Sequence, residues 1–249
     1  MTQPDHVWLP SPQNLALSGD EIHVWRASLE GSPALVQRLQ RTLTPDEAAR
    51  AARFYFERDR THYIVARGVL RSILGRYLGT EPGQLRFSYT SYGKPALIST
   101  SGMRTLNFNL SHSHEIALVA VTRGREIGVD VEHLRADFAG AEIAERFFSA
   151  AENVALRALP PELRVEGFFT CWTRKEAYIK ARGEGLSHPL DQFDVSLVPG
   201  GPAQLLRTRG DPRDLRRWSL KELYPGPGYV AALAAEGHGW RLSCWQWQE

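Results

Sequence analysis

An internal repeat constrains the fold of this chain more than any other feature of its sequence. The hexapeptide YIVARG at 63–68 returns as YIKARG at 178–183, 115 positions later. The segment EIALVAV at 115–121 resembles GYVAALA at 228–234, at the similar spacing of 113. One such match is easily a coincidence, because YIxAR is simply a good helix sequence, but two at nearly one spacing favour a duplication. The repeat predicts two similar halves, each with a long helix followed by an antiparallel sheet.

Local signals agree with this α+β architecture. Capping boxes at 44–47 and 149–152 begin helices, the first of them reaching, with a break allowed, to about residue 77. Apolar alternation and Gly/Pro turns predict strands at 83–92, 105–122 (with a turn at 111–114), 193–198, 215–223, 229–235 and 241–247. The boundary falls near 122–125, giving an N-terminal half of 1–124 and a C-terminal half of 125–249. We expect these pseudo-symmetric halves to hold an active site at their interface.

The composition limits the classes of function. Of 249 residues, 43% are hydrophobic and 23% are charged, which is ordinary for a globular protein in water. A net charge of +2 is too small to indicate nucleic acid as a partner. Cys171 and Cys244 are the only cysteines, so neither a disulfide framework nor a thiolate metal cluster is expected. Since we find no secretory signal and no apolar run of about 20 residues, we expect a cytoplasmic protein that does not enter a membrane.

The first segment that carries chemistry is a strand with two carboxylates. Residues 127–132 read IGVDVE, in which apolar and polar positions alternate as in a half-buried strand. Ile127, Val129 and Val131 are expected to face a core. Asp130 and Glu132 then project side by side from the opposite face. Such a pair is often an ordinary solvent-facing edge, so its meaning depends on the residues that join it.

The second segment is the helical sequence WTRKEAYIK at 172–180. Glu176 and Lys180 share a helix face, where a plain surface ion pair would contribute only about 0.3–0.5 kcal/mol. With Asp130 and Glu132, however, Glu176 completes a set of three carboxylates, and oxygen ligands are what Mg²⁺ prefers. Lys175 and Lys180 beside such a site suit a pyrophosphate. The two segments together predict a magnesium-dependent site for a phosphate-containing substrate.

Polar residues of the first half add candidate phosphate ligands. Ser111 and His112 follow a strand, and hydroxyl and imidazole groups at a strand end can bind phosphate. Their neighbours Ser113 and His114 are better explained as a polar turn. The rigid turn YGKP at 92–95 presents a lysine that also suits a phosphate. The candidates in this half are Arg67, Lys94, Ser111 and His112.

These motifs resemble the signature of the 4'-phosphopantetheinyl transferases. The matching segments are GVDVE at 128–132, FFS at 147–149 and WTRKEAYIK at 172–180. The segments YGKP at 92–95 and FNLSH at 108–112, like the length and the internal repeat, resemble the surfactin-type members, which are two-half monomers. The resemblance spans about residues 51–194. On the first helix, where some members carry an arginine, this chain has His62.

The resemblance implies that the chain transfers 4'-phosphopantetheine from coenzyme A to a serine of an apo acyl or peptidyl carrier protein, releasing adenosine 3',5'-bisphosphate. It implies one Mg²⁺ held by Asp130, Glu132 and Glu176. It also implies phosphate contacts from Arg67, Lys94, Ser111, His112, Lys175 and Lys180. The expected enzyme is a monomer that docks acidic carriers through a salt-sensitive contact.

The general base is left between two carboxylates. Glu176 is expected to accept the serine proton, directly or through a water, while Lys180 stabilises the leaving phosphate. Glu152 is the alternative, although its capping-box position already explains it. Two other functions also remain open. One is a different magnesium-dependent phosphoryl enzyme, such as a nuclease or pyrophosphohydrolase, which would not need two halves. The other is a non-catalytic binder of coenzyme A or carrier proteins, which has no use for three carboxylates.

Overall fold

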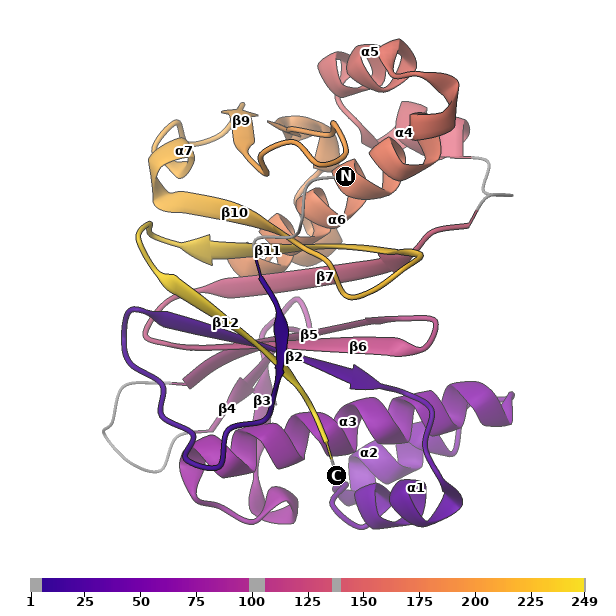
Figure 1. The fold of residues 1–249 in the computed structure, drawn as a ribbon, viewed down its shortest axis with the longest axis vertical. Coiled ribbons are helices and arrows are strands. Elements are labelled where there is room, and N and C mark those ends of the chain that lie inside the picture. Colours follow the sequence, from indigo (N-terminus) through magenta and orange to yellow (C-terminus); the bar gives the residue numbers. More distant parts are fainter. Residues whose placement is uncertain (1–5, 99–105, 136–139, 249) are drawn as a thin grey trace.

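The computed structural model describes residues 6–98, 106–135 and 140–248, and its main elements form four stacked layers (Figure 1). Helix α3 (Glu57–Leu78) is one outer layer, and helix α6 (Arg164–Arg182) is the other. Between them lie a five-stranded and a three-stranded sheet. The two sheets pack face to face through a buried apolar layer that includes Ile22, Val24, Leu118, Val129 and Leu233. The α+β class, with a long helix on each sheet, is confirmed.

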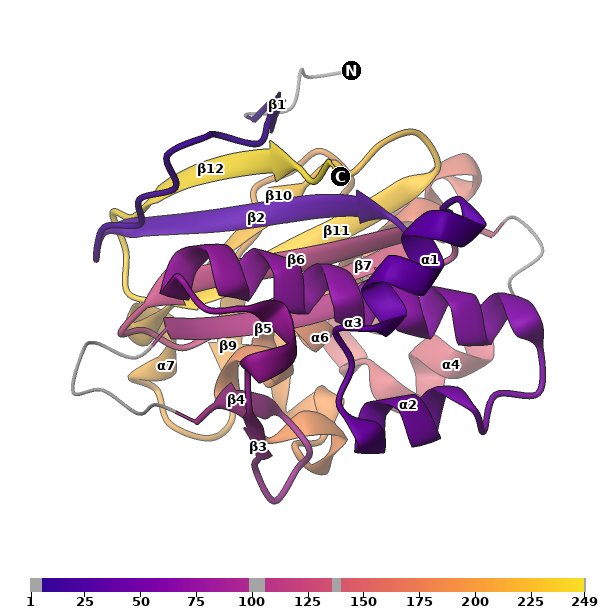
Figure 2. The same ribbon diagram turned by 90° about the horizontal axis from the view of Figure 1, so that it is seen from below.

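The remaining elements surround these layers. Helices α1 (Pro33–Gln40) and α2 (Pro45–Ala51) lie beside α3 (Figure 2), and α4 (Gly140–Phe147) and α5 (Ala150–Ala158) precede α6. The strands are β1 (Trp8–Pro10), β2 (Glu21–Ser28), β3 (Phe87–Tyr89), β4 (Pro95–Leu97), β5 (Leu106–Ser113), β6 (Ile116–Arg123), β7 (Ile127–His133), β8 (Phe193–Val195), β9 (Leu205–Thr208), β10 (Trp218–Leu223), β11 (Tyr229–Glu236) and β12 (Arg241–Gln246). Among the described helices, none combines the length and apolar content that a membrane span requires.

The two halves repeat one topology. In the five-stranded sheet, β6 lies between β2 and β5 and is antiparallel to both. In the three-stranded sheet, β11 lies between β7 and β10 and is again antiparallel to both. The sequence repeats fall on equivalent elements, namely α3 with α6 and β6 with β11. The duplication in the sequence therefore corresponds to a duplication in the structure.

The last strand departs from the predicted arrangement. We expected 241–247 to belong to the sheet of the second half. Strand β12 instead lies in the five-stranded sheet, parallel to β2 on one side and to β1 on the other (Figure 2). Periodicity and turn chemistry identify a strand but do not specify the sheet in which it pairs. The division at 124/125 remains a prediction, and β12 lies across it.

Three local predictions also differ from the structure. The region 83–92 contains only the first arm of a hairpin, β3–β4, which turns at Gly93 with a φ of 82°. The turn predicted at 111–114 begins later in the structure, because β5 continues through Ser113 and the chain reverses at His114, where φ is 51°. Residues 214–217 form helix α7 (Asp214–Arg217) before β10 begins. The predicted strand start at Thr105 lies outside the described residues.

Candidate active site

Strand β7 presents its side chains as the alternation predicts. Ile127, Val129 and Val131 are buried between the two sheets. Asp130 and Glu132 project from the opposite face, toward α6. Asp130 is only 4% exposed, whereas Glu132 is partly exposed. The strand therefore delivers two carboxylates to a face that is largely covered by the helix.

Helix α6 packs so closely on β7 that their backbones are in contact at Gly128. A Cβ added to Gly128 would lie 2.1 Å from the carbonyl oxygen of Ala177 and 2.4 Å from the amide nitrogen of Ala181. Only glycine lets the strand and the helix approach this closely. The contact fixes the part of α6 that carries Glu176 and Lys180 against the part of β7 that carries the carboxylates.

Asp130 is one of the points at which the two halves meet. Lys180 Nζ lies 2.6 Å from Asp130 Oδ1 and 3.0 Å from Ser111 Oγ. Ser111, on β5 of the first half, donates to the same Asp130 oxygen at 2.8 Å. The structure thus brings together three of the residues that we selected from separate sequence motifs.

Polar side chains on β5 join the two sheets along this edge. Asn109 Oδ1 accepts a hydrogen bond from the amide of Val129 at 2.9 Å, and Ser113 donates to Glu132 Oε2 at 2.9 Å. Because alternate positions of a strand share a face, Asn109, Ser111 and Ser113 all reach β7. These polar residues form hydrogen bonds with a neighbouring strand instead of with solvent, which is why the turn begins later than predicted. The spacing of two in N-x-S-x-S was the signal that could have identified Asn109 and Ser113.

The carboxylates act on one another electrostatically. Burial, and next the negative charge of Asp130, raise the pKa of Glu176 from 4.5 to about 7, while Lys180 opposes the shift. Burial and then the Asp130 charge also raise the pKa of Glu132. The three carboxylates therefore share one environment in which further negative charge is unfavourable. A cation among them would relieve this repulsion.

The donor chemistry fits a hard cation, although the side chains are not arranged as a preformed metal site. The buried Asp130 Oδ2 accepts no hydrogen bond from the described residues, whereas Ser111 and Lys180 contact Oδ1. Across residues 6–98, 106–135 and 140–248, no group of three or more His, Cys, Asp or Glu side chains is placed to hold a metal ion. Convergence of Asp130, Glu132 and Glu176 on one Mg²⁺ stays a prediction that their oxygen-only chemistry supports.

Lys175 is placed elsewhere, contrary to our expectation. Its side chain is fully buried, with the ammonium group donating to the carbonyl oxygens of Leu190 and Phe193, each at 2.6 Å. The ammonium also lies 2.8 Å from Glu152 Oε2. Successive helix residues point about 100° apart, so the face that carries Glu176 cannot also present Lys175. A contact between Lys175 and the pyrophosphate is not supported.

Glu152 belongs to the same buried network. It is only 2% exposed and accepts hydrogen bonds from the amides of Ser149 and Val195, at 2.9 and 2.8 Å. The capping box predicted from the sequence is present. Both Glu152 oxygens are therefore used inside the protein core, and this carboxylate joins α5 to α6 and β8.

Arg67 points toward a structural partner and not toward the interface between the two halves, which we call the seam. It pairs with Glu47 of α2, which also lies 2.7 Å from Arg71. Arg67 is 7% exposed, and its guanidinium group stacks over the Phe87 ring at 5.1 Å. The two arginines anchor α2 to α3, so the expected phosphate contact of Arg67 is not supported by its position.

Lys94 lies at the seam between the halves, but at a distance from Asp130. Its ammonium group is 2.8 Å from Glu126 Oε2 and 3.1 Å from the carbonyl oxygen of Ala181. Glu126 precedes Asp130 by four residues, or about 13 Å along an extended strand. Lys94 and Lys180 therefore occupy different stretches of the same interface.

His112 extends the site toward α3. It is exposed at the end of β5, and partial desolvation, followed by the positive charges of Lys180 and His62, lowers its pKa. At neutral pH the imidazole is therefore mainly uncharged and can form hydrogen bonds. Because the charge of His62 affects the pKa of His112, His62 of α3 lies within electrostatic range of His112.

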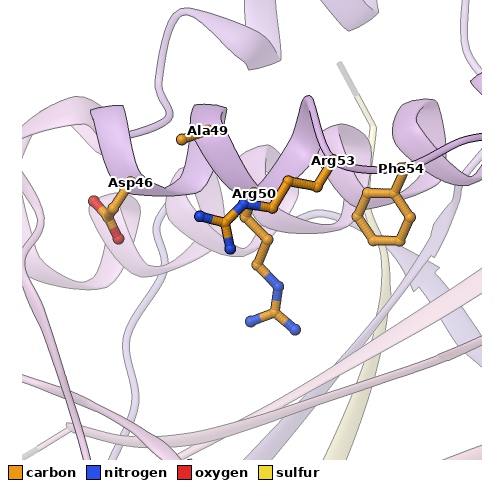
Figure 3. A pocket seen from close by; sticks show the side chains of 5 residues that line it. All are labelled: Asp46, Ala49, Arg50, Arg53 and Phe54. Carbon is orange, nitrogen blue, oxygen red and sulfur yellow. The ribbon is translucent and has the colours of Figure 1, made fainter.

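The protein surface is hollowed at two places of interest. One hollow, of about 580 Å³, is lined by Asp46, Ala49, Arg50, Arg53 and Phe54 (Figure 3). Its Arg50 guanidinium lies 5.6 Å from the centre of the ring of Tyr63, the neighbour of His62 on α3. The other, of about 220 Å³, is largely apolar. It is lined by Glu132, Arg135, Ile143, Phe168, Phe169 and Trp172.

Comparisons with known proteins agree with this architecture. Residues 126–234 match the model of the 4'-phosphopantetheinyl transferase superfamily. Residues 24–123 match a model described as 4'-phosphopantetheinyl transferase, N-terminal. The two models thus meet at the turn between β6 and β7, close to the boundary between the repeated units.

Full-length relatives give the same result. The chain is 46% identical over 242 residues to 4'-phosphopantetheinyl transferase HetI of Nostoc sp., covering 97% of this chain and 99% of the relative. It is 30% identical over 200 residues to 4'-phosphopantetheinyl transferase Sfp of Bacillus subtilis, covering 80% and 84%. A solved ACPS-CoA complex of Chronobacterium ammoniagenes matches 46% of this chain and 98% of its own, with a TM-score of 0.35 and 20% identity. That structural likeness is too weak to carry an argument.

Proposed function

This chain belongs to the 4'-phosphopantetheinyl transferases, and we propose that it moves the phosphopantetheine group of coenzyme A to a serine of an apo acyl or peptidyl carrier protein. The observation that carries this proposal is the meeting of Lys180, Asp130 and Ser111 at the seam of the two halves. The serine oxygen attacks the β-phosphorus of coenzyme A. The bond to the bridging oxygen breaks, and adenosine 3',5'-bisphosphate leaves.

The seam residues fit separate parts of this reaction. Asp130, Glu132 and Glu176 would hold Mg²⁺, which when bound neutralises charge on the pyrophosphate oxygens. Lys180 is a compact positive charge suited to stabilising the departing phosphate. Ser111 orients the Asp130 carboxylate by donating to one of its oxygens. The other oxygen, Asp130 Oδ2, accepts no hydrogen bond from the described residues and is the one that would bind the metal.

Glu176 is the proposed proton acceptor. Its pKa of about 7 matches what a general base needs near neutral pH. Because a neighbouring cation favours the ionised carboxylate and so weakens it as a base, Glu176 would accept the serine proton either directly or through a bridging water that passes the proton on to it. Glu152 is the weaker candidate, because its oxygens already bond Ser149, Val195 and Lys175 in the core.

The two hollows fit different parts of coenzyme A. Polar side chains continue from Lys180 through the uncharged imidazoles of His112 and His62, and the hollow beside α3 adds the guanidinium groups of Arg50 and Arg53. Phosphate oxygens are bound well by guanidinium groups, so this series suits the nucleotide portion. The smaller apolar hollow that includes Glu132 suits the uncharged pantetheine arm. The ammonium group of Lys94 is already paired with Glu126, so only the turn that carries Lys94 is proposed to lie beside the nucleotide.

We also propose a cytoplasmic monomer that binds acidic carriers in a salt-sensitive manner. One chain contains both halves of the seam, so the site needs no second copy. Exposed charge pairs weaken as salt rises. A carrier affinity that does not change with ionic strength would count against electrostatic docking.

The test is to incubate the protein with coenzyme A, Mg²⁺ and an apo carrier, and then to weigh the intact carrier. The proposed function predicts a mass gain of one phosphopantetheine group, which is lost when the carrier serine is replaced by alanine or the metal is chelated. Cleavage of coenzyme A without a mass gain would identify a pyrophosphohydrolase. Binding without either product, over a panel of fatty-acid, polyketide and peptide-synthetase carriers, would identify a non-catalytic binder.

A further inference from the structure

The turn between β3 and β4 reaches across the seam to the end of helix α6. Its Lys94 side chain is only 15% exposed, and its ammonium group is 3.1 Å from the carbonyl oxygen of Ala181. A Cβ added to Gly183 would lie 3.4 Å from Lys94 Cδ, in ordinary van der Waals contact. A lysine of the first half therefore packs against the last turn of a helix of the second half.

The end of α6 has a physical need for this contact. The last four carbonyl groups of a helix lack partners within the helix, and Ala181 belongs to this last turn. Gly183, with a φ of 76°, ends the helix by donating its amide to the carbonyls of Ile179 and Lys180. The Ala181 carbonyl is left for Lys94. A positive charge at a helix C-terminus is also favourable because of the helix dipole.

Glu126 holds the ammonium group in place. One of its carboxylate oxygens lies 2.8 Å from Lys94 Nζ, and the other accepts from Asn107 Nδ2 at 3.3 Å. The Glu126 backbone is itself paired with Glu236 at the end of β11. We name the contact among Lys94, Glu126 and the Ala181 carbonyl the Lys94 bridge. It joins the first half, the start of β7 and the end of α6.

We propose that Lys94 is a positioning residue that holds the last turn of α6, and with it Lys180, against β7. Ala181 directly follows Lys180, whose ammonium group contacts Asp130 and Ser111. Loosening the last turn would therefore release Lys180 from both partners. This role replaces the phosphate contact expected for Lys94 from the sequence. Only its consequence for catalysis rests on the proposed function.

Amide hydrogen exchange of the free protein tests the bridge without any substrate. Lys94→Met should speed exchange in the peptide that covers 179–183 by about threefold or more, the scale of a lost C-terminal charge contact. Glu126→Gln should do the same, and the double variant should add little to either single one, because both remove one bridge. Lys94→Arg should restore most of the protection. Lys221→Met on β10 removes the same charge and serves as the control.

Two results would overturn the proposal. Unchanged exchange at 179–183 in Lys94→Met would show that the bridge does not hold the helix end. Faster exchange throughout the chain would show a general loss of stability in place of a local role. If Lys94→Met does not fold, Glu126→Gln decides the matter alone.

In the transfer assay, the bridge predicts that Lys94→Met lowers kcat while the KM for coenzyme A changes by less than about twofold. A raised KM with unchanged kcat would instead mark a ground-state ligand. The exchange measurement stands even if no carrier accepts the phosphopantetheine group, so the two proposals can fail separately.

Discussion

Glu176 shows how burial and charge act on one side chain of the seam. Its carboxyl group is partly buried and faces the negative charge of Asp130, and both effects favour its protonated form. The positive charge of Lys180, one helical turn further on, lowers the pKa of Glu176 but offsets only part of the rise. A raised pKa in the folded chain has a direct consequence for stability in the absence of metal.

Because the folded chain binds this proton more tightly, Glu176 contributes stability that is fully present below its ordinary pKa of 4.5 and is lost as the pH rises through about 7. Relative to Glu176→Gln, the free energy of unfolding of the wild type should therefore fall between pH 4.5 and 7. Urea unfolding of both proteins across this range, with divalent cations chelated, measures the difference. A difference that does not depend on pH would contradict the account.

Glu152 differs from Glu176 in its contacts, because it has a lysine and two backbone amides as partners in the core. Glu152→Gln removes the charge opposite buried Lys175, and breaking a buried ion pair costs about 3–5 kcal/mol. We expect that loss in unfolding free energy, a similar loss for Lys175→Met, and a transfer rate per folded molecule within about tenfold of the wild type. A hundredfold loss of kcat at unchanged stability would make Glu152 the general base, since that is about the effect of losing one.

At the level of elements, the packing of α6 on β7 determines which side chains can meet. Helix geometry already implies that Glu176 and Lys180 share a face and that Lys175 does not. The sequence therefore contained the information needed to separate Lys175 from the site. It did not reveal the partners of Lys94 and Arg67. Glu126 belongs to no motif, and Glu47 was already explained by the capping box at 44–47.

Gly128→Ala tests this packing. The added methyl group would clash with the Ala177 carbonyl and the Ala181 amide, and both are backbone atoms that cannot turn aside. We expect lower stability and a loss of transfer of at least about tenfold, because a displacement of about 1 Å at a catalytic group can cost a hundredfold. Gly83→Ala is the matched control, since its Cβ would meet nothing closer than 3.8 Å. Wild-type kinetics in Gly128→Ala would show that this close approach is unimportant.

At the scale of the whole molecule, the repeat predicted the two halves and their equivalent elements. It could not predict that β12 completes the first sheet, because strand pairing depends on long-range packing. Cys244 of β12 lies 3% exposed in the layer between the sheets, and Trp245 packs on the core beneath α3. Besides the contacts at the seam, the halves are therefore also joined by β12, which belongs to the second half of the sequence but pairs with strands of the first.

Deletion of 241–249 should accordingly destabilise the first half. The loss would expose the edge of β2 and leave β1 without its partner. We expect residues 1–124 expressed alone to remain largely unfolded, and to gain structure when a peptide of 240–248 is added. Circular dichroism of the fragment with and without the peptide measures this. A fragment 1–124 that folds cooperatively alone would mean that β12 is dispensable.

Phosphopantetheine transfer should require the Asp130 carboxylate, which contacts residues of both halves, and Asp130→Asn tests this requirement most directly. The change keeps the size of the side chain and removes its charge. The initial rate of carrier mass gain should fall by at least about a hundredfold, with thermal unfolding still cooperative. Asp191→Asn, in the exposed turn before β8, should keep the wild-type rate. A folded Asp130→Asn protein that transfers phosphopantetheine within about twofold of the wild-type rate would contradict the account.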